Sequence, residues 1–259
     1  MTFVGASAMV TGKTMGAYPA PKALMSAVYE GSLVPFDTAL KIEARWFTNI
    51  VMNPSSSAMI RSLFISKGAL EKGAVRPKEV PDQRAKKVGV LGAGMMGAGI
   101  ALVAAQAGME VVLVDRSQDV ADKGKAYSEQ YLNAGIKRGK VSDKIKDDIL
   151  NRILATDDYT RLSKADLIIE AVFEDTKVKS DVTKAVLEIV REDCIFASNT
   201  STLPISELAK ASKYPENYIG IHFFSPVEKM LLVEIIKGEK TGNRACLLYT
   251  SDAADDSLR

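Results

Sequence analysis

Residues Lys87 to Asp115 read KVGVLGAGMMGAGIALVAAQAGMEVVLVD, and this stretch decides the fold of the chain. It begins with a short apolar run containing Val88, Val90 and Leu91, which is typical of a strand buried on both faces of a parallel sheet. Three glycines in the spacing G-x-G-x-x-G follow directly and lead into an apolar stretch, Met95 to Ala107, that favours a helix. The order of strand, glycine-rich turn and helix predicts the first half of a βαβ unit.

The three glycines have different steric roles in such a turn. We expect Gly92 to permit the tight turn, Gly94 to let the backbone approach a pyrophosphate, and Gly97 to let the helix pack closely on the strand. Met95 and Met96 open the helix, whose N-terminus offers free N–H groups and a positive partial charge to phosphates. These five residues are the predicted phosphate-binding part of a dinucleotide site.

A second apolar strand, Glu110 to Val114, ends in Asp115, which lies 115 − 92 = 23 residues after the first glycine. At that place a carboxylate can accept hydrogen bonds from the hydroxyls of an adenosine ribose. The same carboxylate repels a 2′-phosphate, so Asp115 favours NAD over NADP as the cofactor. The combination predicts an NAD site, and a βαβ unit with a purely structural role is the alternative.

The bulk composition restricts the class of protein. The chain has 259 residues, 47% of them hydrophobic, and a formal net charge of +2, which gives no electrostatic basis for binding nucleic acid or an anionic membrane. No apolar run approaches the roughly 18 residues of a membrane helix, and the first residues lack the features of a secretory signal. The two cysteines, Cys194 and Cys246, match no disulfide framework and no metal-site spacing. We expect a soluble, cytoplasmic protein without a metal site.

Residues 1 to 83 differ from the rest because they show no alternation of strands and helices. Apolar residues recur there at three- and four-residue spacing, which indicates helices. Pro54 is placed to open the last of these helices at its first position. Gly73, Pro77 and Pro81 then lie in a charged stretch that is typical of a linker. The predicted helices are Pro21 to Tyr29, Phe36 to Met52 and Pro54 to Leu70.

From Lys86 onward, strands and helices alternate. The polar stretch Gln118 to Arg152 is helix-prone with a break at Gly139, which predicts a helical pair inserted after the second strand. This alternation predicts an α/β fold with a Rossmann-type, doubly wound and mostly parallel sheet, preceded by an α-helical segment. The further predicted elements are the strands Asp166 to Val172, Cys194 to Ala197, Tyr218 to Phe223 and Leu231 to Ile236, and the helix Thr176 to Arg191.

His222 is the only histidine of the chain, and it lies near the end of a predicted strand, on the side of an open α/β sheet where ligands bind. Glu234 lies inside the next apolar strand, where an acid is costly to bury unless it is paired. That strand can bring Glu234 beside His222, and such a pair suits hydride chemistry: the imidazole takes the proton of a secondary alcohol and the carboxylate orients it. The alternative is an incidental histidine and an edge-strand glutamate that faces water.

Polar residues also follow two other strands. Residues 198–201, Ser-Asn-Thr-Ser, precede a short predicted helix, so their hydroxyls can cap that helix or bind a substrate hydroxyl next to the histidine. Glu174 and Lys179 follow the strand 166–172, near the path of a cofactor, and a solvated surface pair is their alternative role. We place Asn199, Glu174 and Lys179 among the cofactor-binding residues.

Four sequence blocks occur in the order KVGVLGAGMMGAGIA, DLIIEAVFEDTKVK, IFASNTSTLPISELA and GIHFFSPVEKMLLVEII. With these blocks the chain resembles the L-3-hydroxyacyl-CoA dehydrogenase family, and within it the α subunit of the bacterial multifunctional fatty acid oxidation complex. The resemblance extends from Lys87 to about Gly242.

The resemblance assigns roles to individual residues. It implies that His222 is the catalytic base, that Glu234 is its partner, and that Ser201 contacts the substrate oxygen. It also implies that Glu174 and Lys179 line the NAD site.

The N-terminal blocks YPAPKALMSAVYEG, PFDTALKIEARWF and MIRSLFISKGALEKGAVRPK resemble the end of an enoyl-CoA hydratase module and its linker helix. We therefore divide the chain into this helical part (1–83), an NAD-binding dehydrogenase domain (84–243) and a tail (244–259) that matches no family pattern. Foreign read-through explains such a tail, and a disordered native tail is the alternative. Many members have Asn where this chain has Ser225 and Pro where it has Leu231, so one polar contact near the nicotinamide or substrate differs.

The implied function is the NAD-dependent oxidation of L-3-hydroxyacyl-CoA to 3-oxoacyl-CoA in fatty acid β-oxidation, by an incomplete chain of low activity. The resemblance further implies an acyl-CoA substrate near the insertion Gln118 to Arg152. It implies a parent protein that also hydrates enoyl-CoA and forms a complex with a thiolase β subunit. Two alternatives are a non-catalytic NAD-binding module, which would not need the histidine–glutamate pair, and a methyltransferase with S-adenosylmethionine on the glycine turn.

Overall fold

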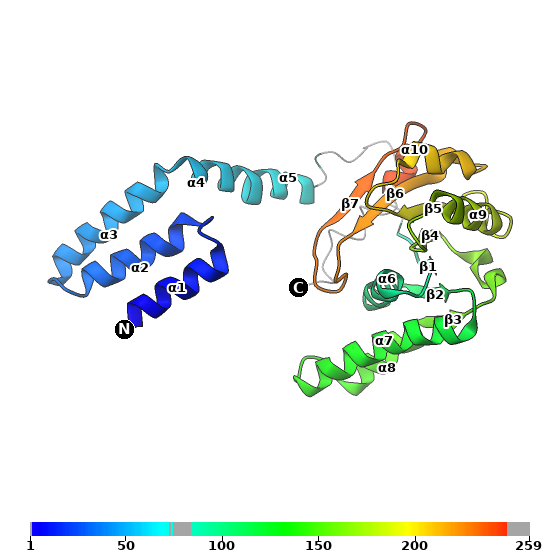
Figure 1. The fold of residues 1–259 in the computed structure, drawn as a ribbon, viewed down its shortest axis with the longest axis horizontal. Helices are drawn as coiled ribbons and strands as arrows, with labels where there is room; N and C mark the ends of the chain where they lie inside the picture. The colour runs from blue at the N-terminus through cyan, green and yellow to red at the C-terminus, as the bar shows by residue number, and fades with distance from the viewer. Residues whose placement is uncertain (1, 73, 75–83, 248–259) are drawn as a thin grey trace. The chain divides into compact units, whose positions relative to one another are not determined.

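The computed structural model describes residues 2–72, 74 and 84–247. The chain divides into two compact units, Met1–Arg76 and Pro77–Arg259, and Figure 1 traces the elements of each. The linker residues Gly73, Pro77 and Pro81 lie outside the described part of the chain.

The first unit is helical, as the spacing of its apolar residues predicts. Pro54 lies in the first turn of α4, where the side chain of Asn53 accepts the N–H of Ser55 at 2.9 Å. Helix α1 lies outside the predicted helices because two glycines lower its helix propensity. The elements are α1 (Thr2–Thr14), α2 (Pro19–Gly31), α3 (Phe36–Val51), α4 (Pro54–Met59), a π-helical turn (Ile60–Ser66) and α5 (Lys67–Glu71).

Helices α2 and α3 pack side by side in this unit. Glu30 of α2 accepts a hydrogen bond from Nε1 of Trp46 at 2.9 Å, and it also pairs with Arg45, so both ends of its carboxylate bind α3. Among the residues of this unit that the structure describes, Ala23 is the only buried hydrophobic one. The unit therefore has very little hydrophobic core of its own.

The second unit contains a seven-stranded sheet in the order β3-β2-β1-β4-β5-β6-β7. The first six strands of this order run parallel, and β7 pairs with β6 in the antiparallel sense. The predicted mostly parallel, doubly wound sheet is confirmed. The strands are β1 (Lys87–Leu91), β2 (Glu110–Val114), β3 (Ile153–Thr156), β4 (Leu167–Glu170), β5 (Ile195–Asn199), β6 (Tyr218–Phe223) and β7 (Val233–Ile236).

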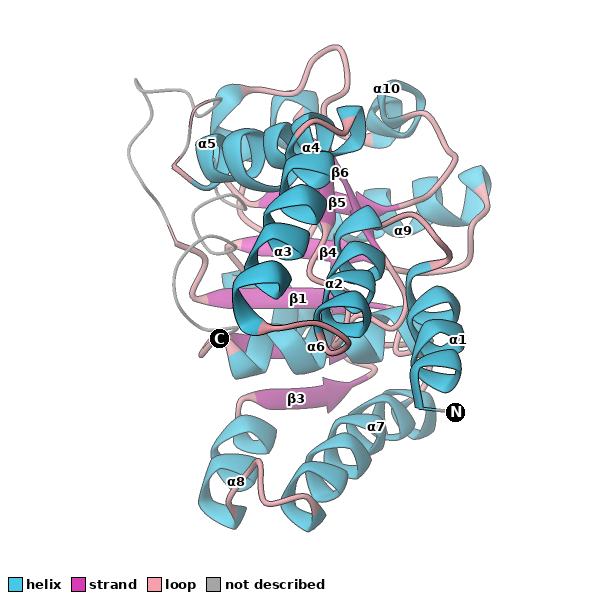
Figure 2. Ribbon diagram, turned by 90° about the vertical axis from the view of Figure 1, so that its left-hand side faces the viewer, coloured by secondary structure: helices cyan, strands magenta, loops and turns pink. Residues whose placement is uncertain are grey.

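The helical pair predicted after the second strand is present as α7 and α8. Gly139 adopts a φ of +68° between them, and Ser142 caps α8 by accepting the N–H of Ile145 at 3.3 Å. The pair lies beside β3, the edge strand that the sequence did not predict (Figure 2). The helices of this unit are α6 (Met95–Gln106), α7 (Gln118–Lys137), α8 (Asp143–Asn151), α9 (Thr176–Leu187) and α10 (Ile205–Leu208), and short 3-10 turns span Tyr159–Lys164, Ala209–Ala211 and Pro215–Asn217.

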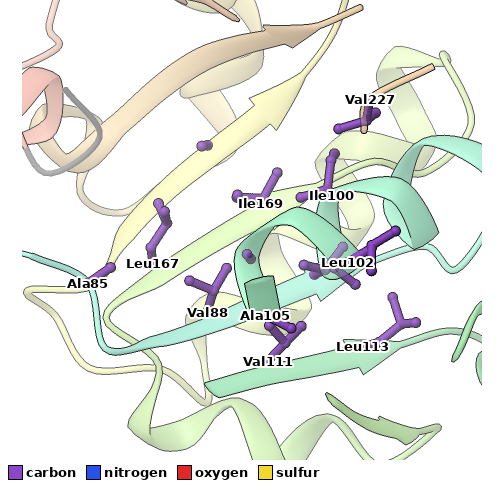
Figure 3. Packing of buried hydrophobic residues seen from close by; sticks show 14 of the residues in the cluster. Ala85, Val88, Ile100, Leu102, Ala105, Val111, Leu113, Leu167, Ile169 and Val227 are labelled. Atoms are coloured by element: carbon purple, nitrogen blue, oxygen red, sulfur yellow. The ribbon is translucent and has the colours of Figure 1, made fainter. Parts of the chain in front are cut away.

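Alternate residues of the strands face two separate hydrophobic cores. Val88 and Val90 of β1 lie in the core that α6, α7 and α8 cover (Figure 3), whereas Leu91 lies in the core that α9 and α10 cover. Figure 1 shows these two groups of helices on opposite faces of the sheet. Because the strands are buried on both faces of the sheet, their sequences are continuous apolar runs. None of the helices in the described residues is long and apolar enough to cross a membrane.

Asp166, just before β4, ties the start of that strand to the start of β1. Its Oδ2 accepts the N–H groups of Lys86 at 2.9 Å and Lys87 at 3.0 Å, and its Oδ1 accepts a hydrogen bond from Arg191 at 3.1 Å. Partial burial raises the pKa of Asp166, but these amides and the guanidinium outweigh that effect and hold its pKa below the ordinary value. The carboxylate thus stabilises the fold in its ionised form.

We predict that Asp166→Asn lowers the free energy of unfolding at pH 7 by about 1–2 kcal/mol, because a charged acceptor of three hydrogen bonds is lost. The folded pKa is depressed, so this contribution is present above the unfolded value of about 3.9 and disappears as the pH falls through the lower folded value. Urea unfolding followed by far-UV circular dichroism at pH 7 and at pH 3 measures the difference.

The matched control is Asp181→Asn, which removes a carboxylate from an exposed pair with Lys177 and should leave the unfolding midpoint almost unchanged. A wild type and an Asp166→Asn variant with equal stability at pH 7 would contradict the prediction.

Candidate functional site

The candidate site lies at the carboxyl ends of the central strands. Two strands lie on one side of β1 and four on the other, so the sheet order reverses between β1 and β4. In open α/β sheets ligands bind at the carboxyl ends of the strands next to such a switch point. The predicted site residues lie in the loops after β1, β2, β4 and β5, in the helices α6 and α9, and in the strands β5, β6 and β7.

The glycine loop after β1 is held by close backbone approaches. Gly92 has a φ of +92°, and a Cβ there would lie 2.7 Å from the carbonyl oxygen of Ala171. A Cβ on Gly97 would lie only 1.7 Å from the carbonyl oxygen of Gly92. The steric requirements expected at these two positions are therefore present in the structure.

Gly94 differs from its two neighbours in the motif. It precedes α6, and a Cβ built on it meets no atom within 4 Å. Packing within the protein thus leaves this position open, and the N-terminus of α6 directs unpaired backbone N–H groups to it. Met95 is 70% exposed beside this opening, whereas Met96 packs partly against the core. The loop fits the phosphates of a dinucleotide.

Asp115 lies directly against the glycine loop. Its Oδ2 accepts the N–H of Ala93 at 2.6 Å, and its Oδ1 accepts the N–H of Arg116 at 2.7 Å. The carboxylate thereby orients the loop, and each oxygen retains a lone pair for a further hydrogen bond. The position at the end of β2 is the one expected for a ribose-binding acid.

The structure brings His222 and Glu234 together. The antiparallel register of β6 and β7 places the two residues opposite each other, and Nδ1 of His222 lies 2.8 Å from Oε2 of Glu234. This contact excludes the interpretation of two unrelated residues. The side chain of Glu234 is 52% exposed, so the strand register, and not the cost of burial, explains its position.

The hydrogen bond also fixes the chemistry of the imidazole. Because a carboxylate only accepts hydrogen bonds, the proton of the neutral imidazole lies on Nδ1 of His222, and the lone pair of this tautomer lies on Nε2. The ring of Phe224 lies against the imidazole with its centroid 4.4 Å away. His222 can therefore take a proton at Nε2 and remain paired with Glu234.

Ser225 connects this pair to the glycine loop. Its Oγ lies 3.9 Å from Sδ of Met95, the first residue of α6. His222 lies three residues before Ser225 in the chain, at the end of β6. A cofactor on the glycine loop and a substrate at His222 would share this edge of the sheet.

Lys179 is fully buried, which excludes a solvated surface pair with Glu174. Its Nζ lies 2.8 Å from Oε1 of Glu170 and 3.3 Å from Oε2 of Glu174, and it donates to the carbonyl oxygen of Asn199 at 3.0 Å. All three donors of the ammonium are thereby used within the protein.

Glu174 connects the loop after β4 with the loop after β5. It accepts hydrogen bonds from the hydroxyl of Thr200 and from the N–H of Ser201, the latter at 3.1 Å. Partial burial raises the pKa of Glu174, but the Thr200 hydroxyl and the charge of Lys179 outweigh it and lower its pKa below the ordinary value. Glu174 is therefore held as a carboxylate at the site.

The residues 199–201, at the end of β5 and directly after it, differ in what their side chains do. Thr200 supports the turn before α10, because its hydroxyl accepts the N–H of Leu203 at 2.9 Å. The side chain of Asn199 accepts the N–H of Phe223 at 3.1 Å, next to His222. Ser201 is exposed, so its hydroxyl is available to a ligand.

One residue of the site was not identified from the sequence. Glu170 at the end of β4 is fully buried. Ser198 of β5, for which a helix cap or a substrate contact was expected, is buried as well and donates a hydrogen bond to Oε2 of Glu170 at 2.7 Å. The signal was present, because Glu170 is an acid inside the apolar run DLIIEAV and a buried acid needs partners.

An open backbone at a helix N-terminus, next to a histidine that a carboxylate orients, is the arrangement of a nicotinamide-dependent dehydrogenase. Residues 87–251 match the family described as 3-hydroxyacyl-CoA dehydrogenase, NAD binding domain. The chain therefore belongs to the 3-hydroxyacyl-CoA dehydrogenase family and carries its NAD-binding domain. Family membership also excludes the methyltransferase interpretation.

Individual relatives agree with this assignment. The fatty acid oxidation complex subunit alpha of Shewanella halifaxensis is 40% identical over 240 residues, which cover 92% of this chain and 34% of that protein. The structure of (S)-3-hydroxybutyryl-CoA dehydrogenase PaaH1 from Ralstonia eutropha matches with a TM-score of 0.63 and 38% identity, over 66% of this chain and 61% of that one. FadB2 of M. tuberculosis matches with a TM-score of 0.64 and 36% identity, over the same shares. The chain spans about a third of the length of the curated relatives it matches.

We predict that one added methyl group has a large effect on stability at Gly97 and almost none at Gly94. Gly97→Ala should lower the free energy of unfolding by about 3 kcal/mol or more, because its Cβ would overlap the Gly92 carbonyl and push α6 away from β1. Gly94→Ala should leave the stability near the wild-type value, because a Cβ there meets no protein atom within 4 Å. Thermal unfolding by circular dichroism compares the two variants, and an equal loss of stability in both would refute this account of the loop.

Proposed function

We propose that this chain binds NAD(H) at the glycine loop and that His222, paired with Glu234, serves the oxidation of L-3-hydroxyacyl-CoA to 3-oxoacyl-CoA in fatty acid β-oxidation. The observation that carries the proposal is the 2.8 Å contact between Nδ1 of His222 and Oε2 of Glu234. A module that only binds NAD has no use for this pair.

The reacting residues have separate roles in this proposal. Nε2 of His222 takes the proton of the substrate 3-hydroxyl group, and Glu234 stabilises the imidazolium that forms. The exposed hydroxyl of Ser201 holds the substrate oxygen. NAD, when bound, would supply the acceptor for the hydride of the carbon atom that carries this hydroxyl group.

The cofactor would lie along the carboxyl ends of the strands. Gly94, Met95 and Met96 would bind its phosphates through their backbone N–H groups. Asp115 would accept the adenosine ribose hydroxyls, in addition to the two amides that it already binds. The remaining cofactor-site residues of the proposal are Gly92, Gly97, Glu174, Lys179 and Asn199.

We extend the proposal to the parent protein through the relatives named as fatty acid oxidation complex alpha subunits. Residues 1–83 then correspond to the end of an enoyl-CoA hydratase module, residues 84–243 to the dehydrogenase domain and residues 244–259 to a tail. The family match extends to residue 251, so it includes the first eight residues of that tail. Ala245 and Leu247 are buried in the structure, so the first part of this tail packs with the domain. The parent would act on acyl-CoA in the cytoplasm and bind a thiolase β subunit.

The nucleotide preference can be tested with the chain itself. We predict that NADH binds about tenfold or more tightly than NADPH, because Asp115 repels the 2′-phosphate and would lose its hydrogen bonds to the ribose. Asp115→Asn keeps an acceptor for the loop amides but removes the charge, so it should reduce this preference. Titration followed by the fluorescence of the reduced nucleotide gives both dissociation constants.

Asp119→Asn is the matched control, because Asp119 is an exposed acid in the first turn of α7, four residues from Asp115. It should leave the preference unchanged. Equal dissociation constants for NADH and NADPH in the wild type would refute the prediction.

Turnover can be tested with acetoacetyl-CoA-dependent oxidation of NADH, in the chain alone and in a version extended with the C-terminal region of a relative. We predict a large gain on extension, because a second wall of the cleft would hold the thioester in hydride-transfer geometry. In the extended protein, His222→Gln should lower kcat by about 10²–10⁴, and Glu234→Gln should lower it by a smaller factor. NADH affinity should remain near the wild-type value in both variants.

Glu239→Gln, an exposed acid three residues after β7, is the control and should leave kcat unchanged. If the chain alone is as active as the extended version, the proposed effect of a second wall of the cleft is contradicted. An unaffected kcat in His222→Gln would contradict the role of the histidine.

A further inference from the structure

The most deeply buried charges of the described residues lie just below the candidate NAD site. Glu170 at the end of β4 and Lys179 in α9 both have fully buried side chains, and Nζ of Lys179 lies 2.8 Å from Oε1 of Glu170. Removing two charges from water is costly, and burying such a pair often gives no net stability compared with apolar residues of similar size. The pair therefore calls for an explanation other than stability.

The hydrogen bonds around Glu170 are complete. Its Oε1 accepts the N–H of Val172 at 2.8 Å as well as the ammonium of Lys179, and its Oε2 accepts the hydroxyl of Ser198 at 2.7 Å. These partners come from the loop after β4, from α9 and from β5. Glu170 thus connects three elements at the carboxyl edge of the sheet.

Lys179 connects Glu170 to two loops of the candidate site. Its ammonium binds Glu174 and the carbonyl oxygen of Asn199 in addition to Glu170. Glu174 in turn binds Ser201, and the side chain of Asn199 binds the N–H of Phe223, next to His222. The loops that would hold the cofactor and the substrate oxygen therefore share one buried support.

We propose that Glu170, assisted by Ser198, is a positioning residue of the cofactor site. It fixes the buried ammonium of Lys179, which in turn holds the Glu174 carboxylate and the Asn199 carbonyl where the cofactor runs. This inference rests on the NAD site proposed above. It assigns Glu170 no contact with NAD or substrate, because its effect passes through Lys179.

A double-mutant cycle tests this path in the full 259-residue chain. NADH affinity is measured by nucleotide fluorescence for the wild type, Glu170→Gln, Lys179→Met and the double variant. We expect Glu170→Gln to weaken NADH binding about tenfold, the effect of losing one charge-assisted hydrogen bond. We expect Lys179→Met to weaken it at least as much, and the double variant to bind no more weakly than Lys179→Met.

A purely structural role would give a different pattern. The loss caused by Glu170→Gln would then also occur in the Lys179→Met background, and such additive losses would overturn the inference. Wild-type affinity in Glu170→Gln would overturn it as well. Thr183→Val is the matched control, because Thr183 lies one turn after Lys179 in α9 and is equally buried, so NADH affinity should stay near the wild-type value.

Glu170→Gln leaves Lys179 with one fewer carboxylate, and circular dichroism shows whether that variant folds. If it does not fold, Ser198→Ala replaces it in both backgrounds, since it removes the 2.7 Å hydrogen bond to Glu170 and leaves the charges of Glu170 and Lys179 in place. The inference is supported if Ser198→Ala lowers NADH affinity in the wild-type chain but not in the Lys179→Met variant. Equal losses of NADH affinity in both overturn it. If the wild type binds no NADH, the proposed function is wrong. If the wild type binds NADH but the losses of affinity in the two single variants add up in the double variant, only the inference about Glu170 is wrong.

Discussion

The close approach of Gly97 to the carbonyl oxygen of Gly92 is the constraint on which the rest of the second unit depends. With no side chain between them, α6 packs directly against the turn after β1, and its N-terminus opens at the carboxyl edge of the sheet. The same approach brings Met95 next to Ser225, in the loop after β6. The position of the glycine loop next to the loop after β6 is therefore tied to the backbone packing of α6 on β1.

The one antiparallel strand of the sheet, β7, determines the geometry of the histidine–glutamate pair. In a parallel sheet the next strand needs a long crossover before it returns to the same edge, whereas an antiparallel neighbour returns after a loop. Strand β7 thus places Glu234 directly opposite His222. Every other strand pair of the sheet is parallel, so the reversal at β7 occurs only where a short cross-strand hydrogen bond is formed.

Local sequence could predict the parts of the fold that local chemistry determines. The βαβ unit follows from steric needs within residues 87–115, and the histidine–glutamate pair follows from two neighbouring strands. The edge strand β3 was missed because it has four residues and is only half-buried, so its apolar signal merges with the end of the helical pair. The contacts of Glu170 with Lys179 and Ser198 could not be predicted because the three residues come from different elements, and their proximity depends on sheet order and helix packing.

The single tryptophan of the chain, Trp46, lies in the helical unit, where its indole nitrogen binds Glu30. The described part of the second unit contains tyrosine and phenylalanine but no tryptophan. Indole emission therefore reports the environment of the N-terminal helices, and the optical signal of a bound nicotinamide reports the second unit. The two halves of the chain thus carry separate spectroscopic labels, and the order in which they lose structure can be followed in a single sample without attaching a dye.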